Sequence, residues 1–426
     1  MKQFKIIRRK NKEDKAEVSI RLKLIVFSFS LFTFHFVSGQ QLQSYIEEAS
    51  ANSPVIQAYN LRHHIAEEKV NEADWIPNTE FSAGFFVSEP ETRTGAQRAR
   101  FSARQMLPWF GTITARENYA SSMADAEYVE IVIAKRKLSL SVSQSYYRLY
   151  AIKAKQKILD ANVQLLKTYE KLALSSVEVG KASVVDVLRL QIRQNELQQR
   201  KEVLDEEYAG EQIAFNKLLH REGTTAVTTL TALLLPAEDI VHAESDLALN
   251  PELLSYDRLY ESIAQSELLN RAERNPMIGF GLDYVPVSER PDVNFSDNGK
   301  DIFMPMVSVS IPIFNTKYDS KSKQNALKQL EITSQKDNRL DVLASAFAKA
   351  VSQRNQARII YNTQEKNVQQ AANVEEILIK NYETGTIDFN DVLDIQELQL
   401  KFQINQIRAI TTYYTQSAIV NYLITQ

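Results

Sequence analysis

The chain has 426 residues, a formal net charge of −3 and a mean hydropathy of −0.31, with 11 glycines, 11 prolines and no cysteine. So few glycines and prolines, against a combined share of about 12% in average proteins, favour long uninterrupted helices. The absence of cysteine excludes disulfide bonds, cysteine-based metal sites and a lipid-modified N-terminal cysteine. The acidic balance argues against nucleic acid as a partner.

Residues 1–39 have the pattern of a secretory signal peptide. Nine Lys and Arg residues precede an apolar run at 24–34, and the small residues Val37-Ser38-Gly39 follow it, as signal peptidase requires. The run is shorter than the ~20 residues of a transmembrane helix. We therefore expect a cleaved signal, with a retained anchor as the alternative. Without this segment the chain keeps 41 basic and 50 acidic residues, a net charge of −9.

The remaining chain predicts two similar halves, 40–249 and 250–426. Each half begins with a proline-initiated amphipathic stretch, at Pro54 and Pro251. Proline is favoured at the first position of a helix and disfavoured further inside. The two expected helices cover about 53–74 and 251–274.

A pair of strands follows each helix, because apolar and polar residues alternate with period two. The predicted strands are 79–87 and 99–107 in the first half, and 277–285 and 303–313 in the second. Strands of ~9–11 residues suit a tilted membrane crossing, and a soluble sheet with one buried face is the alternative. Four strands cannot close a barrel, and lipid does not tolerate open sheet edges. Membrane insertion would therefore require several chains to share one barrel.

Two groups of side chains on these strands are candidate ligands. Arg98, Arg100 and Arg104 share the polar side of the second strand, where they could line a lumen or form an ordinary solvated edge. Met304 and Met306 share one side of the fourth strand. They could contact a soft metal ion, but we interpret them as membrane-facing packing.

Each strand pair is followed by a helical tract without glycine or proline, at 112–179 and 315–384. At 1.5 Å per residue, each tract would reach about 100 Å. A second helix returns over 184–219 and 388–424, with apolar residues at coiled-coil spacing. These heptad positions are Leu190, Leu197 and Leu204, and Leu393, Leu400, Ile407 and Tyr414. Residues 222–249 predict a mixed linker, with room for one short strand.

The turns between the paired helices, at about 178–186 and 382–394, are hairpin tips and carry the most specific motif. In each tip a glycine breaks the helical pattern, and an aspartate six residues later belongs to the next helix. The glycine–aspartate pairs are Gly180 with Asp186, and Gly385 with Asp391. The second tip also carries Asp394, where the first has Arg189. Only the second tip therefore has two carboxylates on one helix face.

The chain resembles the TolC-type outer-membrane efflux proteins, also called outer membrane factors. The resemblance covers about residues 42–425 and rests on the duplication, the paired strands, the Pro-aromatic strand ends and the tips. Its most specific element is the order Tyr382, Gly385, Thr386, Asp391, Val392, Leu393 and Asp394.

The resemblance implies an α+β membrane protein that forms a homotrimer. Three chains would build one twelve-stranded barrel in the outer membrane, continuous with a periplasmic α-helical barrel of coiled-coil hairpins. The protein would be a passive export duct of a tripartite efflux or type I secretion system. Its partners would be outer-membrane lipid, a periplasmic adaptor and an inner-membrane pump.

Gate residues carry over by position. The resemblance implies that Tyr382 helps to close the periplasmic mouth and that Asp186 tethers neighbouring helices there. Asp391 and Asp394 would line the narrowest constriction as two rings, which favour cations. For Asp186 and Asp388 the alternative is helix capping. Where a relative has an arginine, this chain has Ile387.

No catalytic set stands out, so we expect neither an enzyme nor a cofactor or metal site. The adjacent His63 and His64 would point about 100° apart on a helix, which suits one metal ion poorly. The alternative to a duct is a periplasmic coiled-coil adaptor or scaffold without a pore. A secreted hydrolase on a helical scaffold is less favoured, because no acid, base or nucleophile converges.

Overall fold

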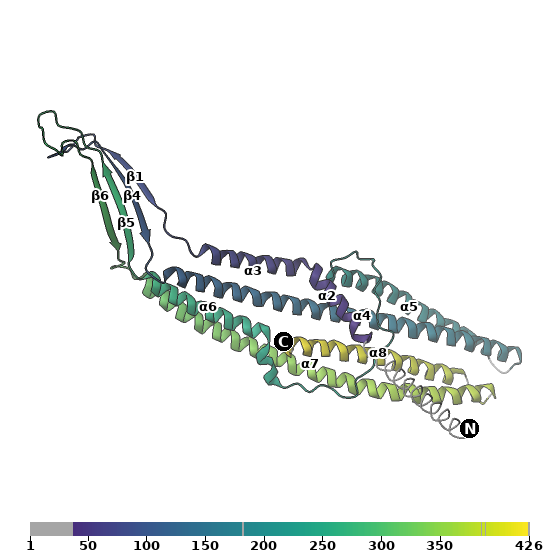
Figure 1. Ribbon diagram of the computed structural model, residues 1–426. Coiled ribbons are helices and arrows are strands. Elements are labelled where there is room, and N and C mark those ends of the chain that lie inside the picture. Colours follow the sequence, from purple (N-terminus) through teal and green to yellow (C-terminus); the bar gives the residue numbers. More distant parts are fainter. Residues whose placement is uncertain (1–36, 181–182, 385, 388, 425–426) are drawn as a thin grey trace, which may run out of the picture. The chain divides into compact units, whose positions relative to one another are not determined.

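The structure is a computed structural model that describes residues 37–180, 183–384, 386–387 and 389–424 (Figure 1). Most of the expected signal peptide, residues 1–36, lies outside the described residues. Residues 37–39 belong to the first described helix, α2 (Val37–Asn52). None of the helices in these ranges is long and apolar enough to cross a membrane.

The chain divides by its contacts into two compact units, and each draws on both predicted halves. The first unit contains the described residues of 1–54, 135–243 and 345–424, and the second contains 55–134 and 244–344. The two halves that meet at residue 250 were inferred from the sequence alone and are not these two units, so the division into halves stays a proposal.

The second unit holds an antiparallel sheet of four strands. They are β1 (Glu80–Phe85), β4 (Ala99–Leu107), β5 (Met277–Val285) and β6 (Ile302–Ser310), in the order β1-β4-β5-β6. The ribbon of β2 (Glu91–Thr92) and β3 (Gly95–Ala96) lies in the first loop. The predicted fourth strand ran to 313, but β6 ends at Ser310, before Pro312, which has no N–H for a strand ladder.

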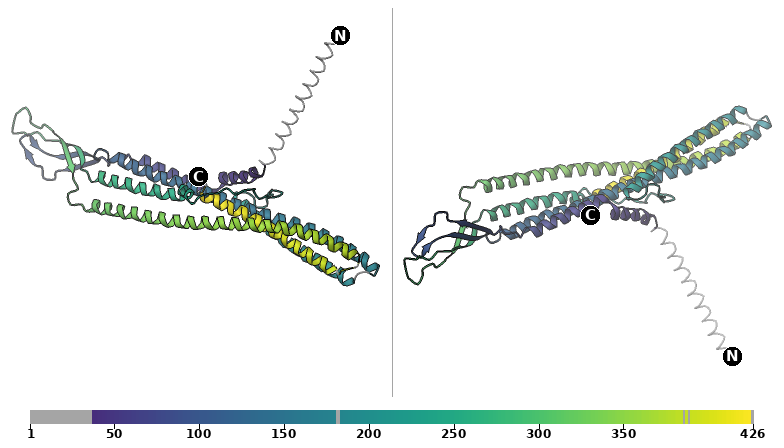
Figure 2. Two further views of the ribbon diagram at one scale, coloured as in Figure 1. Left: turned by 90° about the horizontal axis from the view of Figure 1, so that it is seen from below. Right: turned by 90° about the horizontal axis from the view of Figure 1, so that it is seen from above.

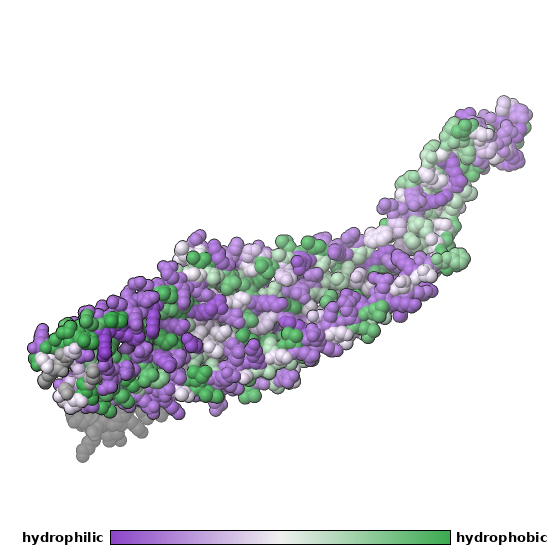
Figure 3. Space-filling model, turned by 180° about the vertical axis from the view of Figure 1, so that it is seen from behind, coloured by the Kyte–Doolittle hydropathy of each residue, from purple (hydrophilic) through white to green (hydrophobic). Residues whose placement is uncertain are grey.

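The register gives the sheet two chemically different faces. Phe81 pairs with Ala103, Phe101 with Tyr284, and Phe280 with Val307, so these side chains share one face. This face is apolar and exposed: Phe81 is 80% exposed and Val307 71%. In Figure 3 the sheet is largely green, and the loops at its end are purple.

The opposite face is polar. Arg100 forms an ion pair with Asp283, whose side chain is fully buried. Arg104 and Ser102 share this face. Met304 lies directly opposite Asp283, and Met306 lies opposite Gly281. Both methionines thus lie on the polar face, where they alternate with Phe303, Pro305 and Val307 of the apolar face; their interpretation as membrane-facing packing stays a prediction.

The helices of the second unit are α3 (Pro54–Glu72), α6 (Pro251–Glu273) and the first parts of α4 (Thr112–Glu178) and α7 (Lys317–Glu383). Two of them, α3 and α6, begin at the predicted prolines, Pro54 and Pro251. Asn250 caps α6 by accepting the Glu252 N–H at 2.8 Å. Asn270 of α6 donates to the Tyr318 carbonyl at 2.9 Å, which joins α6 to α7.

Two helical hairpins make up most of the first unit (Figures 1 and 2). The end of α4 pairs with α5 (Val184–Leu218), and the end of α7 pairs with α8 (Phe389–Ile424). One core joins all four helices, through Leu166 of α4, Leu190 of α5, Tyr382 of α7 and Val392 of α8. Three of the heptad leucines are core residues: Leu190 and Leu197 are fully buried, and Leu400 is 2% exposed. Leu204 and Leu393 are partly buried and pack against the same core.

Residues 222–243, which we call the strap, cross the helices of the first unit without forming a strand. The short strand expected within 222–249 is absent; the described chain there has only a 3-10 helix, Glu244–Leu249. Helix tyrosines take the place of a strand partner for the strap backbone. Tyr146 and Tyr150 accept the N–H groups of Leu230 and Leu233 at 3.1 and 3.0 Å. Buried backbone groups thus find partners without a sheet.

A paired charge fixes the end of the strap. Arg358 of α7 donates two hydrogen bonds to Asp239, at 2.8 and 2.9 Å, and one to the Pro236 carbonyl at 2.9 Å. Tyr413 of α8 donates to the same carboxylate. The hydrogen bonds from Arg358 lower the pKa of Asp239 below its ordinary value.

Asp239→Asn is expected to destabilise the protein by about 1–3 kcal/mol at neutral pH, the usual range for hydrogen bonds to a charged group. Folding lowers the pKa of Asp239, so the stability that its charged carboxylate adds to the protein is fully present above the pKa of the unfolded chain, about 3.9. It is lost as the pH falls through the folded value. Thermal unfolding should therefore show a gap between wild type and variant that closes below about pH 4. The control is Asp160→Asn, which removes a carboxylate from the exposed pair with Lys201 and should cost under about 1 kcal/mol. If the two variants cost the same, the hydrogen bonds between Arg358 and Asp239 do not fix the strap.

Candidate functional site

The first tip is a capped helix start. Gly180 ends the turn of α4 with a φ of +72°, a conformation that other residues rarely adopt. Ser183 caps α5 by accepting the Val185 N–H at 3.1 Å. Asp186 accepts the Ser183 N–H at 3.2 Å and completes a capping box. Asp186 is 8% exposed, so within one chain its carboxylate is occupied by the helix start.

The second tip closes α7 with the threonines of its motif. Thr386 donates to the Asn381 carbonyl from its N–H at 3.0 Å and from its hydroxyl at 2.8 Å, and the Thr384 hydroxyl donates to the same carbonyl at 2.8 Å. These bonds satisfy a carbonyl that the helix end leaves without a partner. Gly385, the predicted turn residue, and Asp388, a predicted cap, lie outside the described residues.

Aromatic side chains pack behind the second tip. Tyr382 is 6% exposed, and its ring meets Phe389 edge-on at a centroid distance of 4.8 Å. Phe389 is 1% exposed and meets Tyr169 of α4 at 5.9 Å. Ile387 packs against the same core. Within one chain Tyr382 is thus a core residue, and apolar packing stands where the resemblance implied an arginine.

A buried hydrogen bond joins the two hairpins beside these rings. The Tyr169 hydroxyl donates to Glu375 of α7 at 2.6 Å, and both side chains are buried. Burial and the neighbouring carboxylate raise the pKa of Tyr169, so the phenol stays protonated and remains a donor.

Asp391 and Asp394 differ from Asp186 because they face outward. Both are exposed and lie one turn apart on α8, while Val392 between them is fully buried in the core. Among the described residues neither carboxylate has a hydrogen-bond or ion-pair partner. Both charges are therefore available to solvent, to ions or to another chain.

Sequence reasoning missed two arginines of α5 that reach the start of α8. Arg189 donates to Asn390, and Arg193 lies 3.2 Å from Glu397 and 2.7 Å from Glu196. The available signal was their spacing, since residues four apart on a helix share a face. The two contacts join the first tip to the second within the chain.

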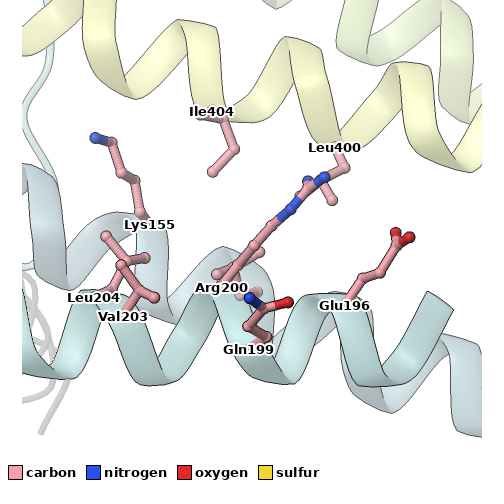
Figure 4. Close-up of a pocket in the computed structure, with 9 residues that line it drawn as sticks. Lys155, Glu196, Gln199, Arg200, Val203, Leu204, Leu400 and Ile404 are labelled. Atoms are coloured by element: carbon pink, nitrogen blue, oxygen red, sulfur yellow. The ribbon is translucent and has the colours of Figure 1, made fainter. Parts of the chain in front are cut away.

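An open groove lies between α4, α5 and α8 of the first unit (Figure 4). Its volume is about 560 Å³. The floor is apolar, and the charged lining residues are Lys155, Glu196 and Arg200, which Figure 4 shows on helices α4 and α5. No acid, base and nucleophile converge among the lining residues, so the groove does not suggest an enzyme.

In the described part of the chain, no group of three His, Cys, Asp or Glu side chains could hold a metal ion. His63 instead contacts the Ala124 carbonyl at 3.2 Å, and His64 contacts Glu67 at 2.8 Å.

No protein-family model matches the sequence, and no curated protein matches it. Solved structures do match the fold. CusC is 15% identical, with a TM-score of 0.72, over 90% of this chain and 92% of CusC. The outer membrane protein VceC of Vibrio cholerae is 18% identical, with a TM-score of 0.69, over 90% of this chain and 96% of VceC. The outer-membrane channel OprN is 15% identical, with a TM-score of 0.72, over 90% of each chain.

These neighbours are outer membrane factor channels of the TolC type. The chain has the TolC-type fold. The match covers 90% of the chain. It does not assign roles to individual tip residues.

Proposed function

We propose that the protein is a passive outer-membrane export duct of a tripartite efflux or type I secretion system. The observation that carries the proposal is the sheet, which exposes an apolar face on one side and holds an ion pair on the other. Exposed apolar surface of this kind marks contact with lipid or with another protein. The fold shared with outer-membrane channels favours lipid.

The sheet edges support a trimer. β1 and β6 each pair on one side only, which leaves a free edge at both ends of the sheet. Free edges are costly in lipid and invite pairing with another chain. Three copies joined edge to edge would close a barrel of twelve strands, apolar outside and polar inside. The helices would then extend into the periplasm, where an adaptor and an inner-membrane pump would complete the system.

The gate would lie at the second tip. Asp391 and Asp394 are exposed carboxylates there and would form two acidic rings in a trimer, which favour cations. Tyr382 would keep the mouth closed through its packing with Phe389. Asp186 would act first as a cap, and any tether to a neighbouring chain would add to that. A pore-free periplasmic adaptor would gain nothing from the exposed apolar face of the sheet.

The purified mature protein is expected to form a detergent-stable trimer and to conduct ions weakly in planar bilayers. Light scattering in detergent gives the oligomeric state, and single-channel recording gives the conductance and its cation preference. A monomer that never conducts, under conditions where a known porin does, would overturn the proposal.

A further inference from the structure

One exposed stripe runs along α8 away from the second tip. It contains Asp394, Lys401 and Arg408, which are spaced seven residues apart, and all three side chains are exposed. Residues seven apart on an α-helix differ in direction by only about 20°, so these side chains leave α8 on nearly the same side. Gln396 and Ile410, on the opposite side of the helix, are buried at 0% and 2% exposure. The stripe is therefore the free face of α8 within one chain.

The charge of this stripe changes sign along the helix. Its tip end is acidic, through Asp394, but α8 has no Asp or Glu beyond Glu397, and its remaining charged residues are Lys401 and Arg408. Glu397, at the edge of the stripe, lies 3.2 Å from Arg193 of α5. At 1.5 Å per residue, Lys401 lies about 10 Å and Arg408 about 21 Å from Asp394 along the helix. The basic part is thus a separate zone behind the acidic tip.

Neither basic side chain is neutralised within the chain. Among the described residues no hydrogen bond or ion pair joins Lys401 or Arg408 to another group. By contrast, Arg148, Arg193 and Arg358, on the other helices of the same unit, all contact carboxylates. Unpaired cations on an exposed face attract anions from solution, because no adjacent carboxylate cancels their field.

The first hairpin has no such zone. At the positions of α5 that correspond in the duplication, Glu196 stands for Lys401 and Val203 for Arg408. Glu196 is itself paired with Arg193 at 2.7 Å. The basic zone therefore belongs to α8 alone, and it is not a by-product of the duplication.

We propose that Lys401 and Arg408 line the lumen of the duct and form a basic zone behind its acidic mouth, where they determine how readily anions pass. The inference rests on the proposed function, which places Asp394 in the lumen, since residues on one side of a helix face the same way. Rings of Lys and Arg favour anions. The distance of about 10 Å from Asp394 to Lys401 exceeds the Debye length of about 8 Å at physiological salt. Each zone would therefore act on passing ions separately.

Neutralising the zone by Lys401→Gln with Arg408→Gln is expected to raise the cation-to-anion permeability ratio of the trimer by about threefold or more. Both side chains are exposed and unpaired among the described residues, so the double variant should fold and trimerise as wild type does. Reversal potentials in asymmetric salt give the ratio, and light scattering in detergent checks the trimer.

The matched control removes the same charge at the same height of the helices. Lys155 and Arg200 line the groove of Figure 4 together with Leu400 of α8, which precedes Lys401 but is not on the stripe. Lys155→Gln with Arg200→Gln should leave the permeability ratio close to that of wild type. An equal shift in both double variants would show that the stripe has no special part in selectivity and would overturn the basic zone.

A second measurement locates the side chains directly. The chain has no cysteine, so Lys401→Cys and Arg408→Cys each introduce one thiol per copy for labelling. A negatively charged methanethiosulfonate added to a conducting trimer should change the current in steps as the copies react. Gln199→Cys, at an exposed position of the same groove, should react without changing the current.

These results separate the basic zone from the duct. A conducting trimer whose permeability ratio is unchanged by Lys401→Gln with Arg408→Gln would overturn the zone and leave the duct standing. Labelled thiols at both positions that leave the current unchanged would do the same. A wild-type protein that neither trimerises nor conducts would remove the duct and the zone together.

Discussion

Replacing both Asp391 and Asp394 by asparagine is expected to lower the cation-to-anion permeability ratio of the trimer by on the order of tenfold. The two carboxylates are exposed, one turn apart and without partners among the described residues. Two unit charges at 4 Å interact by about 1 kcal/mol in water, and about 1.4 kcal/mol corresponds to a tenfold change. Three copies would remove six such charges from one constriction. Asparagine keeps the side-chain shape, so the change is mainly one of charge.

Reversal potentials in asymmetric salt give the permeability ratio directly. The matched control is the pair Asp337→Asn and Asp341→Asn, two exposed aspartates one turn apart on α7 in the second unit. High salt should diminish the effect, because exposed charges are screened. A ratio that changes equally in both double variants would place the selectivity elsewhere in the pore.

Phe389→Ala is expected to destabilise the second tip by about 3–5 kcal/mol, the usual cost of emptying a buried aromatic site. Phe389 is 1% exposed and contacts both Tyr382 and Tyr169. Without the Phe389 ring, Tyr382 of α7 and Tyr169 of α4 would lose the side chain that both of them contact. Amide hydrogen exchange should accelerate over the last turns of α7 and the first turns of α8.

Two further variants calibrate that result. Phe389→Leu keeps most of the volume and should cost much less. Val185→Ala removes methyl groups from a side chain that is 51% exposed, so exchange there should change little. If Phe389→Ala leaves the exchange of the tip as slow as Val185→Ala does, the aromatic packing does not hold the mouth closed.

The helices and strands could be predicted because their signals are local. Alternation at 99–107 and 277–285 gave β4 and β5 with the bounds that the structure has, and the glycine-free tracts gave α4 and α7 within two or three residues. Pairing of β4 with β5 was not predictable from such signals, because residues about 180 positions apart carry no local pattern.

The tips show where sequence reasoning reached its limit. Asp186 and Asp391 hold equivalent positions in the two copies, yet Asp186 is buried at 8% exposure and Asp391 is exposed. The difference depends on neighbours such as Ser183, which forms the capping box. The face of Met304 was out of reach for a related reason, because pairing with Asp283 across the sheet places it beside polar neighbours that its own strand does not reveal.

The capping box at the first tip has a consequence for the symmetry of the mouth. Three copies of the proposed assembly would bring six hairpin ends together, two from each chain. The carboxylate of the first tip is committed to starting a helix, whereas those of the second are left in solvent. A ring that is close to six-fold in shape would then be only three-fold in charge. An adaptor that approaches it would find two alternating kinds of position, one whose carboxylate caps a helix and one with two exposed carboxylates.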